Sequence, residues 1–231
     1  MPEPTIQDRL WVGCPSITQL GYDKQIIVCD NCAQFVMKCC HHPNECCHYY
    51  RLVFADGACS GNGFMGARAG VGIALGVNDD NQLSKPFSAL DGAESRRTSQ
   101  VAELRAAREA VNAIDGLPPD SKLQSLKQKR QHKRVVQPTG IWIIAMDSEY
   151  VVKGMTEWLP KWKANGMRTA QGKLPVNIDL FLSLEESLSK VEESRNVEIC
   201  FWYIPRAVNK IADKLAKDGA KLDMPTTCST T

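Results

Sequence analysis

Four acidic residues, far apart in the 231-residue chain, are candidates for shared chemistry: Asp56, Glu103, Asp147 and Asp213. Carboxylates that cluster in a cleft repel one another unless cations are present, and hard oxygen ligands of this kind suit Mg²⁺ or Mn²⁺. Two such ions held about 3.5–4 Å apart stabilise the attacking and leaving oxygens of a phosphodiester displacement. The four residues therefore predict a two-metal site, on condition that the fold brings them together.

Two of the four acids lie at the ends of predicted strands. A short apolar run at 52–54 is typical of a buried strand, and Asp56 ends it. The run at 141–146 is apolar throughout, which favours a strand buried on both faces, and Asp147 ends it. Ligands bind beyond the carboxyl ends of strands in open α/β sheets, so this repetition favours a site at that edge.

The other two acids lie near the starts of predicted helices. Glu103 is in the first turn of a helix expected over 98–115, which Thr98 and Ser99 can cap, and Asp213 is near the start of a helix over 209–222. Each acid alone is also explained as a carboxylate that complements the helix dipole, an effect worth about 0.3–1 kcal/mol. Only their combination with the strand acids points to a site.

The remaining pattern completes an α/β domain. Three antiparallel strands are expected over 51–55, 69–77 and 83–90, with glycine-rich and Asn/Asp-rich turns between them. Helices are expected over 150–158 and 178–191, and a last strand over 197–204. The order is three strands, helix, strand, helices, strand, helix.

Composition excludes several classes of protein. Hydrophobic residues make up 43% and charged residues 23% of the chain, with a net charge of +2, as in ordinary globular proteins. No segment approaches the roughly 18 apolar residues of a membrane span. The N-terminus lacks the basic start and apolar run of a secretory signal, so we expect an intracellular protein, in the nucleus or the cytoplasm. Ten cysteines then favour reduced thiols or metal ligands over disulfides.

Residues 1–48 predict a small Cys/His-rich module. Cys29 and Cys32 have the two-residue spacing that presents two thiolates to one tetrahedral Zn²⁺. His41, His42 and His48 are further candidate partners, but the preferred remaining ligands are Cys39 and Cys46, with their neighbours Cys40 and Cys47 as alternatives. The competing interpretation is a disordered arm whose cysteines are incidental.

Two further segments are rich in cations. Residues 117–140 contain a basic run without acids, which is typical of a solvated insertion, although its charge also adds attraction to a polyanion. Residues 158–179 mix cations with Trp158 and Trp162, a combination that suits a phosphate backbone with sugars or bases packed on the rings. The alternative is a helix that packs both rings inward.

Taken together, residues 51–222 resemble a type 1 ribonuclease H domain of the cellular kind. The resemblance rests on FADGACSGNG at 54–63, RAGVG at 68–72, RRTSQVAEL at 96–104, MDSEYVV at 146–152, the basic segment 158–177 and NKIADKLA at 209–216. It implies a mixed five-stranded sheet, three antiparallel strands and then two parallel ones, flanked by helices. The domain would cover 49–222 with the insertion at 117–140, between the N-terminal module and a flexible tail at 223–231.

The resemblance also implies roles for individual residues. Asp56, Glu103, Asp147 and Asp213 match the four metal-binding carboxylates of the family. Contacts to the minor groove of an RNA/DNA hybrid and to RNA 2′-hydroxyls are implied for Cys59, Ser60, Asn62, Gly63, Ser99 and Gln100. A pocket for a DNA phosphate is implied for Arg96, Thr98 and Asn165, and a channel for the DNA strand for Trp158 and Trp162.

Three positions depart from the family's pattern. Ser99 stands where Asn is usual, and Met167 where Trp is usual. The family commonly has a loop with Gly-His-x-Gly before its last helix, whereas residues 204–209 read IPRAVN, which is shorter and has no His. That His assists metal exchange or product departure, so we expect slower turnover here, with Arg206 near the scissile phosphate.

The predicted activity is hydrolysis of the RNA strand of RNA/DNA hybrids by an endonuclease. It would use two Mg²⁺ ions, or Mn²⁺, and leave 5′-phosphate ends. The alternative is a module that binds hybrids or double-stranded nucleic acid with little or no catalysis. We expect a monomer with no membrane partner, and a structural Zn²⁺ in the N-terminal module.

Overall fold

The computed structural model describes residues 5–7, 9–40, 46, 48–64, 66–90, 96–118 and 139–223. Most of the predicted insertion (119–138) and of the predicted tail (224–231) lies outside these residues. Cys47, one of the alternative zinc ligands, also lies outside them.

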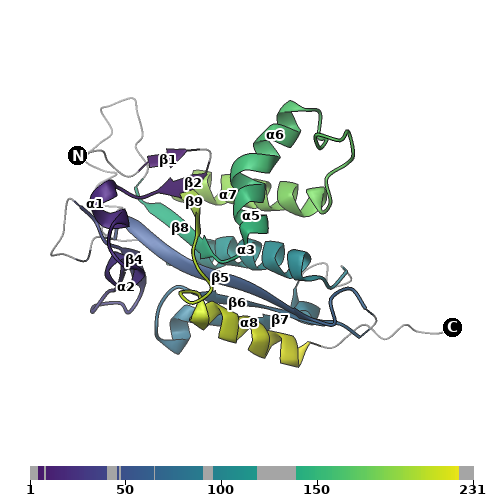
Figure 1. The fold of residues 1–231 in the computed structure, drawn as a ribbon. Helices are drawn as coiled ribbons and strands as arrows, with labels where there is room; N and C mark the ends of the chain where they lie inside the picture. Colours follow the sequence, from purple (N-terminus) through teal and green to yellow (C-terminus); the bar gives the residue numbers. More distant parts are fainter. Residues whose placement is uncertain are drawn as a thin grey trace.

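Five strands form the centre of the sheet (Figure 1). They are β5 (Tyr50–Ser60), β6 (Arg68–Ala74), β7 (Gln82–Pro86), β8 (Ile141–Met146) and β9 (Glu198–Tyr203). The first three are antiparallel to one another, while β8 is parallel to both β5 and β9. The predicted five-stranded mixed sheet is confirmed, with β5 at its centre.

The N-terminal segment adds strands to this sheet on both sides. Its elements are β1 (Thr5–Gln7), β2 (Leu10–Val12), α1 (Pro15–Thr18), α2 (Tyr22–Gln25), β3 (Ile26–Val28) and β4 (Phe35–Met37). Strand β2 pairs in parallel with β9, and β4 pairs antiparallel with β5 through Val36 and Arg51. The described strands thus form one nine-stranded sheet, in which the N-terminal segment flanks the expected core.

Helices cover both faces of the sheet. The longer ones are α3 (Ser99–Gly116), α7 (Ile178–Arg195) and α8 (Lys210–Leu222). Figure 1 shows α8 on one face, and α3 and α7 on the other. Two short 3₁₀ turns, η1 (Asp79–Asn81) and η2 (Phe87–Ala89), flank β7.

Alternating side chains of the strands divide the core into two apolar clusters. Val53 and Ala55 of β5 pack in one cluster with residues of α3 and α7, whereas Leu52 and Phe54 pack in the other. The second cluster includes Ala212 of α8 together with N-terminal residues such as Trp11, Cys14, Ile17 and Phe35. The N-terminal segment therefore completes the second face of the sheet, next to α8.

Several predicted elements differ in extent. The first strand was expected over 51–55 with Asp56 ending it, but β5 continues to Ser60, so Asp56 lies within the strand and is paired with Gly72 of β6. The third strand was expected to reach residue 90 but ends at Pro86, which has no N–H to donate to a neighbouring strand. The helix expected over 150–158 is divided into α5 (Glu149–Lys153), the π-helical turn η3 (Gly154–Trp158) and α6 (Leu159–Ala164). Pro160 at the start of α6 cannot donate the regular helical hydrogen bond, which accounts for the change of pitch there.

The segment α5–η3–α6 rises from the sheet, and α6 with the loop after it projects furthest (Figure 1). Each helix in the described part of the chain is too short or too polar to cross a membrane.

Candidate active site

Asp56 and Asp147 lie side by side just beyond the end of the β5–β8 ladder, Asp56 within β5 and Asp147 directly after β8. The β5–β8 ladder runs up to the pair Phe54 and Ala145, and each acid follows its paired residue by two positions. Neighbouring strands are about 4.8 Å apart, so this register brings the two carboxylates to one place. The predicted pairing of two strand-end acids follows directly from the register.

A glycine lets the third acid approach. Gly57 follows Asp56, and a Cβ atom at Gly57 would overlap the backbone of Ala102 and Glu103 in α3. Helix α3 therefore lies against β5 more closely than any side chain at position 57 would allow. Thr98 begins the helix, because its hydroxyl accepts a 3.2 Å hydrogen bond from the N–H of Val101. The carboxylate of Glu103 is held next to Asp56 as a result.

A second glycine does the same for the fourth acid on the opposite face. Gly72 is paired with Asp56 across β5 and β6, and a Cβ atom there would overlap the backbone of α8 at Ala212 and Ala216. Asp213 directly follows Ala212, so the close approach of α8 brings Asp213 to the end of β5. The four predicted carboxylates thus reach one edge of the sheet from two strands and two helices.

The electrostatics of Asp56 and Glu103 are those of crowded carboxylates. Burial, together with the negative charges of Asp147 and Asp213, raises the pKa of Asp56 to about 7. Burial and the charges of Asp56 and Asp147 raise the pKa of Glu103 to about 9, although a hydrogen bond from the Gly57 backbone opposes this. The ionised forms of both groups are therefore unfavourable until positive charge is brought close.

Two cations already pair with Asp213. Arg206 Nη2 lies 2.8 Å from one carboxylate oxygen, and Lys217 Nζ lies 2.6 Å from the other. Partial burial works to raise the pKa of Asp213, but the hydrogen bonds from Lys217 and Arg206 outweigh it and hold the pKa below its usual value. Arg206 is largely exposed at the rim of the site.

Asn209, to which the sequence analysis gave no role, joins the two strands at the site. Its side chain is fully buried, and its Nδ2 donates to Asp147 Oδ1 at 2.6 Å and to the carbonyl of Ala55 at 3.0 Å. These two bonds fix the orientation of the Asp147 carboxylate beside β5. A polar residue directly before the predicted last helix was the only sequence signal for it.

The carboxylates open into a cleft of about 770 Å³. Asp56, Glu103 and Asp213 line one part of it, and the rest is lined by cationic side chains and by small uncharged residues. Of these cations Arg206 was predicted, whereas Arg68, Lys217 and Lys221 were not. Asp213, Lys217 and Lys221 recur every four residues and so share one face of α8, a spacing that the sequence does contain.

Several residues predicted to contact nucleic acid lie at this cleft. Cys59, Ser60 and Ser99 line it, next to the part of β5 that extends beyond its pairing with β8. Asn62 accepts a 2.9 Å hydrogen bond from the N–H of Ser99, which joins the turn after β5 to the start of α3. Gln100 is exposed in the first turn of α3.

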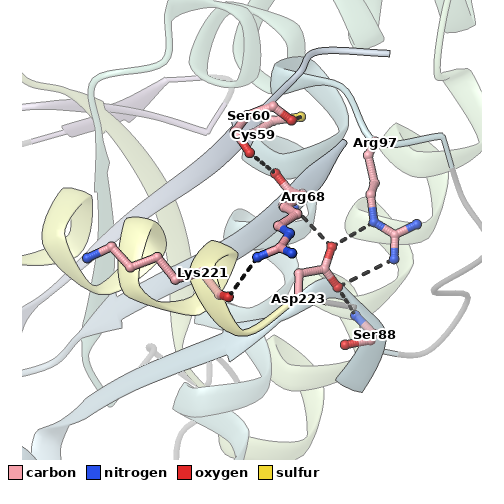
Figure 2. Close-up of polar contacts among 8 residues, drawn as sticks. Cys59, Ser60, Arg68, Ser88, Arg97, Lys221 and Asp223 are labelled. Atoms are coloured by element: carbon pink, nitrogen blue, oxygen red, sulfur yellow. Dashed lines mark hydrogen bonds and ion pairs between the residues drawn. The ribbon is translucent and has the colours of Figure 1, made fainter. Parts of the chain in front are cut away.

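A buried ion pair supports the segment that carries Arg96 and Thr98. Arg97 Nε donates to Asp223 at 2.7 Å, and Asp223 also accepts from the backbone N–H groups of Ala69 and Ser88 (Figure 2). Figure 2 shows this pair beside Cys59, Ser60 and Arg68. Gly63 donates its N–H to the carbonyl of Arg97 at 2.7 Å, so one framework holds both loops.

The same loops bring Arg96 close to Gly63 and Thr98. A Cβ atom at Gly63 would lie 3.7 Å from the Arg96 guanidinium and 3.8 Å from the Thr98 methyl group. Asn165, the third predicted phosphate contact, follows α6, where its amide donates to the carbonyls of Arg168 and Thr169.

The two tryptophans of the basic segment are half-buried in an aromatic cluster. Trp158 and Trp162 lie 6.1 Å apart between ring centroids. Trp162 also contacts Phe181, and Trp158 contacts Tyr150. The structure favours the inward packing of both rings, with part of each ring exposed.

The acidic end of the cleft fits divalent cations. Glu103 Oε2 is buried and has no hydrogen-bond partner among the described residues. A buried carboxylate oxygen without a donor is costly, and a hard cation satisfies it. Asp56, Glu103, Asp147 and Asp213 supply the oxygen ligands that Mg²⁺ or Mn²⁺ prefers.

A second group of potential ligands lies in the N-terminal segment. Ligand atoms of Cys29, Cys46 and His48 are within 4.8 Å of one another, so the structure brings together two of the predicted zinc ligands. Cys32 adjoins them, with its Sγ 3.9 Å from His48 Nε2. Cys39 is instead buried in the second apolar cluster, and His48, a candidate partner in the sequence, was not among the preferred ligands.

Comparison with known proteins shows similarity over most of the chain. Residues 49–221 match the family model for RNase H. Ribonuclease H of Jannaschia sp. is 32% identical over 171 residues, which cover 73% of this chain and 89% of that protein. Ribonuclease H1 of Rattus norvegicus is 30% identical over 174 residues, 74% of this chain and 50% of that protein, so the chain spans about half the length of its mammalian relatives.

A solved structure shows the same fold. The foamy viral protease-reverse transcriptase, determined in complex with an RNA/DNA hybrid, aligns with a TM-score of 0.50 at 22% identity. The alignment covers 75% of this chain and 20% of the viral protein. With the family model matching three quarters of its length and the bacterial relative matched almost end to end, this chain belongs to the ribonuclease H family.

Proposed function

We propose that this protein is an endonuclease that hydrolyses the RNA strand of RNA/DNA hybrids with the help of two divalent metal ions. The observation that carries the proposal is the meeting of Asp56, Glu103, Asp147 and Asp213 beside a cleft that four cations also line, Arg68, Arg206, Lys217 and Lys221. Carboxylates that crowd in this way are stabilised by added positive charge. The cationic side chains of the cleft would attract a polyanionic substrate.

The four carboxylates would hold the ions, which supply an activated water and stabilise the leaving 3′ oxygen, so that the product carries a 5′-phosphate. Asn209 keeps the Asp147 carboxylate turned toward Asp56. Arg206, at the rim and paired with Asp213, has its guanidinium on the cleft side, where it would contact the phosphate under attack.

Selectivity for RNA would come from the wall formed by Cys59, Ser60 and Ser99. Small polar groups next to a strand edge reach into a minor groove and can recognise 2′-hydroxyl groups, which DNA lacks. Arg96 and Thr98, held by the Arg97–Asp223 pair, would bind a phosphate of the DNA strand. The solved relative that binds an RNA/DNA hybrid has the same fold and supports this choice of substrate.

One observation favours a second candidate function, that of a hybrid-binding module with weak or no catalysis. Arg206 and Lys217 together occupy both carboxylate oxygens of Asp213, and these ion pairs compete with a metal ion for that ligand. A protein in which this competition prevails would still bind a hybrid through its basic cleft.

Cleavage of an end-labelled RNA/DNA hybrid in Mg²⁺ or Mn²⁺ tests both candidates. The controls are the Asp147→Asn variant, which keeps the size of the side chain but removes its charge, and an RNA/RNA duplex of the same sequence. We expect cleavage of the hybrid alone, internal fragments with 5′-phosphate ends, and loss of cleavage in the variant.

Binding is measured in parallel by fluorescence anisotropy. Binding of the hybrid without cleavage in either metal would contradict the catalytic proposal and support the binding module. Cleavage that survives in Asp147→Asn would place the chemistry elsewhere in the molecule.

A further inference from the structure

Three cysteines and a histidine gather at the far end of β5 from the carboxylates. His48 Nε2 lies 3.2 Å from Cys29 Sγ and 3.9 Å from Cys32 Sγ. Cys46 Sγ is within 4.8 Å of the ligand atoms of both Cys29 and His48. Cys29 is buried, while Cys32, Cys46 and His48 are partly exposed.

The local backbone presents the first two thiols on one turn. Strands β3 and β4 pair antiparallel from Ile26 to Met37, and Cys29 and Cys32 lie in the turn between them. The turn is closed by a 2.7 Å hydrogen bond from Ala33 N–H to the Cys29 carbonyl. Ala33 has a φ of 57°, in the left-handed region that non-glycine residues seldom adopt. Backbone strain of this kind persists only where the surroundings fix it.

The other two groups come from the chain that leads into β5. Cys46 and His48 are separated by one residue, and His48 precedes β5 by two positions. The carbonyl of His48 accepts a 3.0 Å hydrogen bond from Arg51 Nε, and the carbonyl of Tyr49 accepts one from Ile141 of β8. This anchoring to the sheet holds the imidazole against the β3–β4 turn.

We propose that Cys29, Cys32, Cys46 and His48 bind one structural Zn²⁺ ion. Tetrahedral zinc with Zn–S near 2.3 Å and Zn–N near 2.0–2.1 Å places its ligand atoms about 3.5–3.8 Å apart. The measured separations of 3.2 Å and 3.9 Å lie on either side of that range. Three soft thiolates and one imidazole are a ligand set that selects zinc over Mg²⁺ or Ca²⁺.

A disulfide is the competing use of these thiols. It would join two of the cysteines and leave the third thiol and the imidazole without a common partner. In the structure no disulfide joins Cys29, Cys32 and Cys46 to one another. Three potential ligands that meet at one point, with Cys32 beside them, are explained by an ion and not by a single covalent bond.

The proposed ion would be structural. Asp56 is eight residues beyond His48, and an extended chain rises roughly 3.3 Å per residue. Asp56 therefore lies about 26 Å from His48. Zinc would join the β3–β4 turn to the chain entering β5, and so fasten the N-terminal segment to the central strand. Its loss should therefore lower the melting temperature while leaving the magnesium ligands in place.

The test is metal analysis of the full chain, purified with a reductant and without added chelator. We expect about one zinc per chain by inductively coupled plasma mass spectrometry. Replacement by Co²⁺ should give the thiolate-to-cobalt charge-transfer band and the intense visible bands of a tetrahedral site. This spectrum is recorded on the wild-type protein, so the result does not depend on whether a variant folds.

Variants then identify the ligands. Cys46→Ser and His48→Ala should lose zinc, whereas Cys39→Ala, which removes a buried thiol outside the cluster, should keep it. His48→Cys supplies a fourth thiolate, so it should retain zinc and shift the cobalt bands. This variant also separates loss of a ligand from loss of the fold.

Three results would overturn the proposal. The first is a folded wild-type chain that binds neither zinc nor cobalt stoichiometrically. The second is zinc that is lost in Cys39→Ala but retained in His48→Ala. The third is a disulfide between Cys29 and Cys46 in the purified protein, detected by mass spectrometry after alkylation.

Discussion

Arg206 Nη2 lies 2.8 Å from Asp213 Oδ1, so the carboxylate expected to bind metal is already paired with a guanidinium at the rim of the cleft. Arg206 lies in the loop before α8, where the sequence departs from the histidine-containing loop of the family it resembles, and Asp213 lies in the first turn of α8. Lys217 approaches the other oxygen of the same carboxylate from one turn further along α8. Both cations therefore pair with Asp213, but Arg206 lies at the rim of the cleft and Lys217 lies on α8.

Replacing Arg206 should show whether its guanidinium acts on the substrate phosphate or only through Asp213. If the guanidinium contacts the reacting phosphate, Arg206→Ala should lower kcat by about 10- to 100-fold, as for loss of one positioned donor to a developing charge. Lys217→Ala removes the other cation from Asp213 and should cost much less. Steady-state cleavage over a range of Mg²⁺ concentrations measures both. Equal losses in the two variants would show that Arg206 acts only through Asp213.

The raised pKa values of Asp56 and Glu103 predict that the metal-free protein becomes less stable as the pH rises. A carboxyl group whose pKa is raised by folding binds more protons folded than unfolded, so the free energy of unfolding falls as pH rises between the two values. For Glu103 that window runs from 4.5 to about 9, and for Asp56 from 3.8 to about 7. The melting temperature in EDTA should therefore fall from about pH 5 to about pH 9, and Mg²⁺ should restore part of the loss.

Glu103→Gln tests the origin of that dependence. The amide keeps the shape of the side chain but takes up no proton on folding, so it avoids the cost of protonating Glu103 at a pH above the unfolded pKa of 4.5. At about pH 8 and without metal, the variant should therefore be more stable than the wild-type protein by at least about 1 kcal/mol, the worth of one pKa unit, although it should not cleave hybrid. Calorimetry in EDTA measures the difference, and a variant less stable than wild type would contradict the repulsion inferred at this site.

Much of the site could be predicted because strand ends and helix starts leave clear patterns. Asp56 and Asp147 end apolar runs, and Thr98 has the sequence context of the helix cap that it forms. Asn209 was missed because its role depends on a contact between distant segments, the last helix and the end of β8, which no local pattern encodes.

The N-terminal segment shows the same limit. Its Cys29-x-x-Cys32 spacing predicts a metal knuckle, but the choice of partners depends on how the chain returns to β5, and this places His48 and not Cys39 beside Cys29. No pattern in the sequence indicated that β2 and β4 extend the sheet on both sides. Strands of three residues are too short for periodicity to reveal.

The ion pair of Asp223 and Arg97 should be important for stability. The Asp223 side chain is fully buried and accepts hydrogen bonds from Ala69, Ser88 and Arg97. Removing one partner of a buried pair typically costs about 3–5 kcal/mol, so Asp223→Asn should lower the free energy of unfolding by about that amount. Asp218→Asn, which breaks an exposed pair with Lys221 nearby on α8, is the control and should have no measurable effect.

The sign of the pH effect at Asp223 is opposite to that at Glu103. Although burial works to raise it, the hydrogen bonds from Arg97, Ala69 and Ser88 hold the pKa of Asp223 below its usual value. Its contribution is complete above the ordinary pKa of 3.8 and is lost as the pH falls through the lower folded value. Denaturation by urea in acid should therefore show a smaller difference between Asp223→Asn and wild type than at neutral pH.

Gly57 should tolerate no side chain, because its Cβ would occupy the space of the α3 backbone at Ala102 and Glu103. Gly57→Ala must push α3 away from β5, which should cost about 1–3 kcal/mol as overpacking does and should also move the Glu103 carboxylate away from Asp56. Gly116→Ala is the matched control at the end of the same helix, since among the described residues nothing beyond the adjacent backbone lies within 4 Å of the added methyl group. It should be neutral or slightly stabilising, because alanine loses less conformational freedom than glycine on folding. Urea denaturation and hybrid cleavage measured on both variants separate the two effects. A Gly57→Ala protein as stable and as active as wild type would show that the close approach of α3 is not what assembles the four carboxylates.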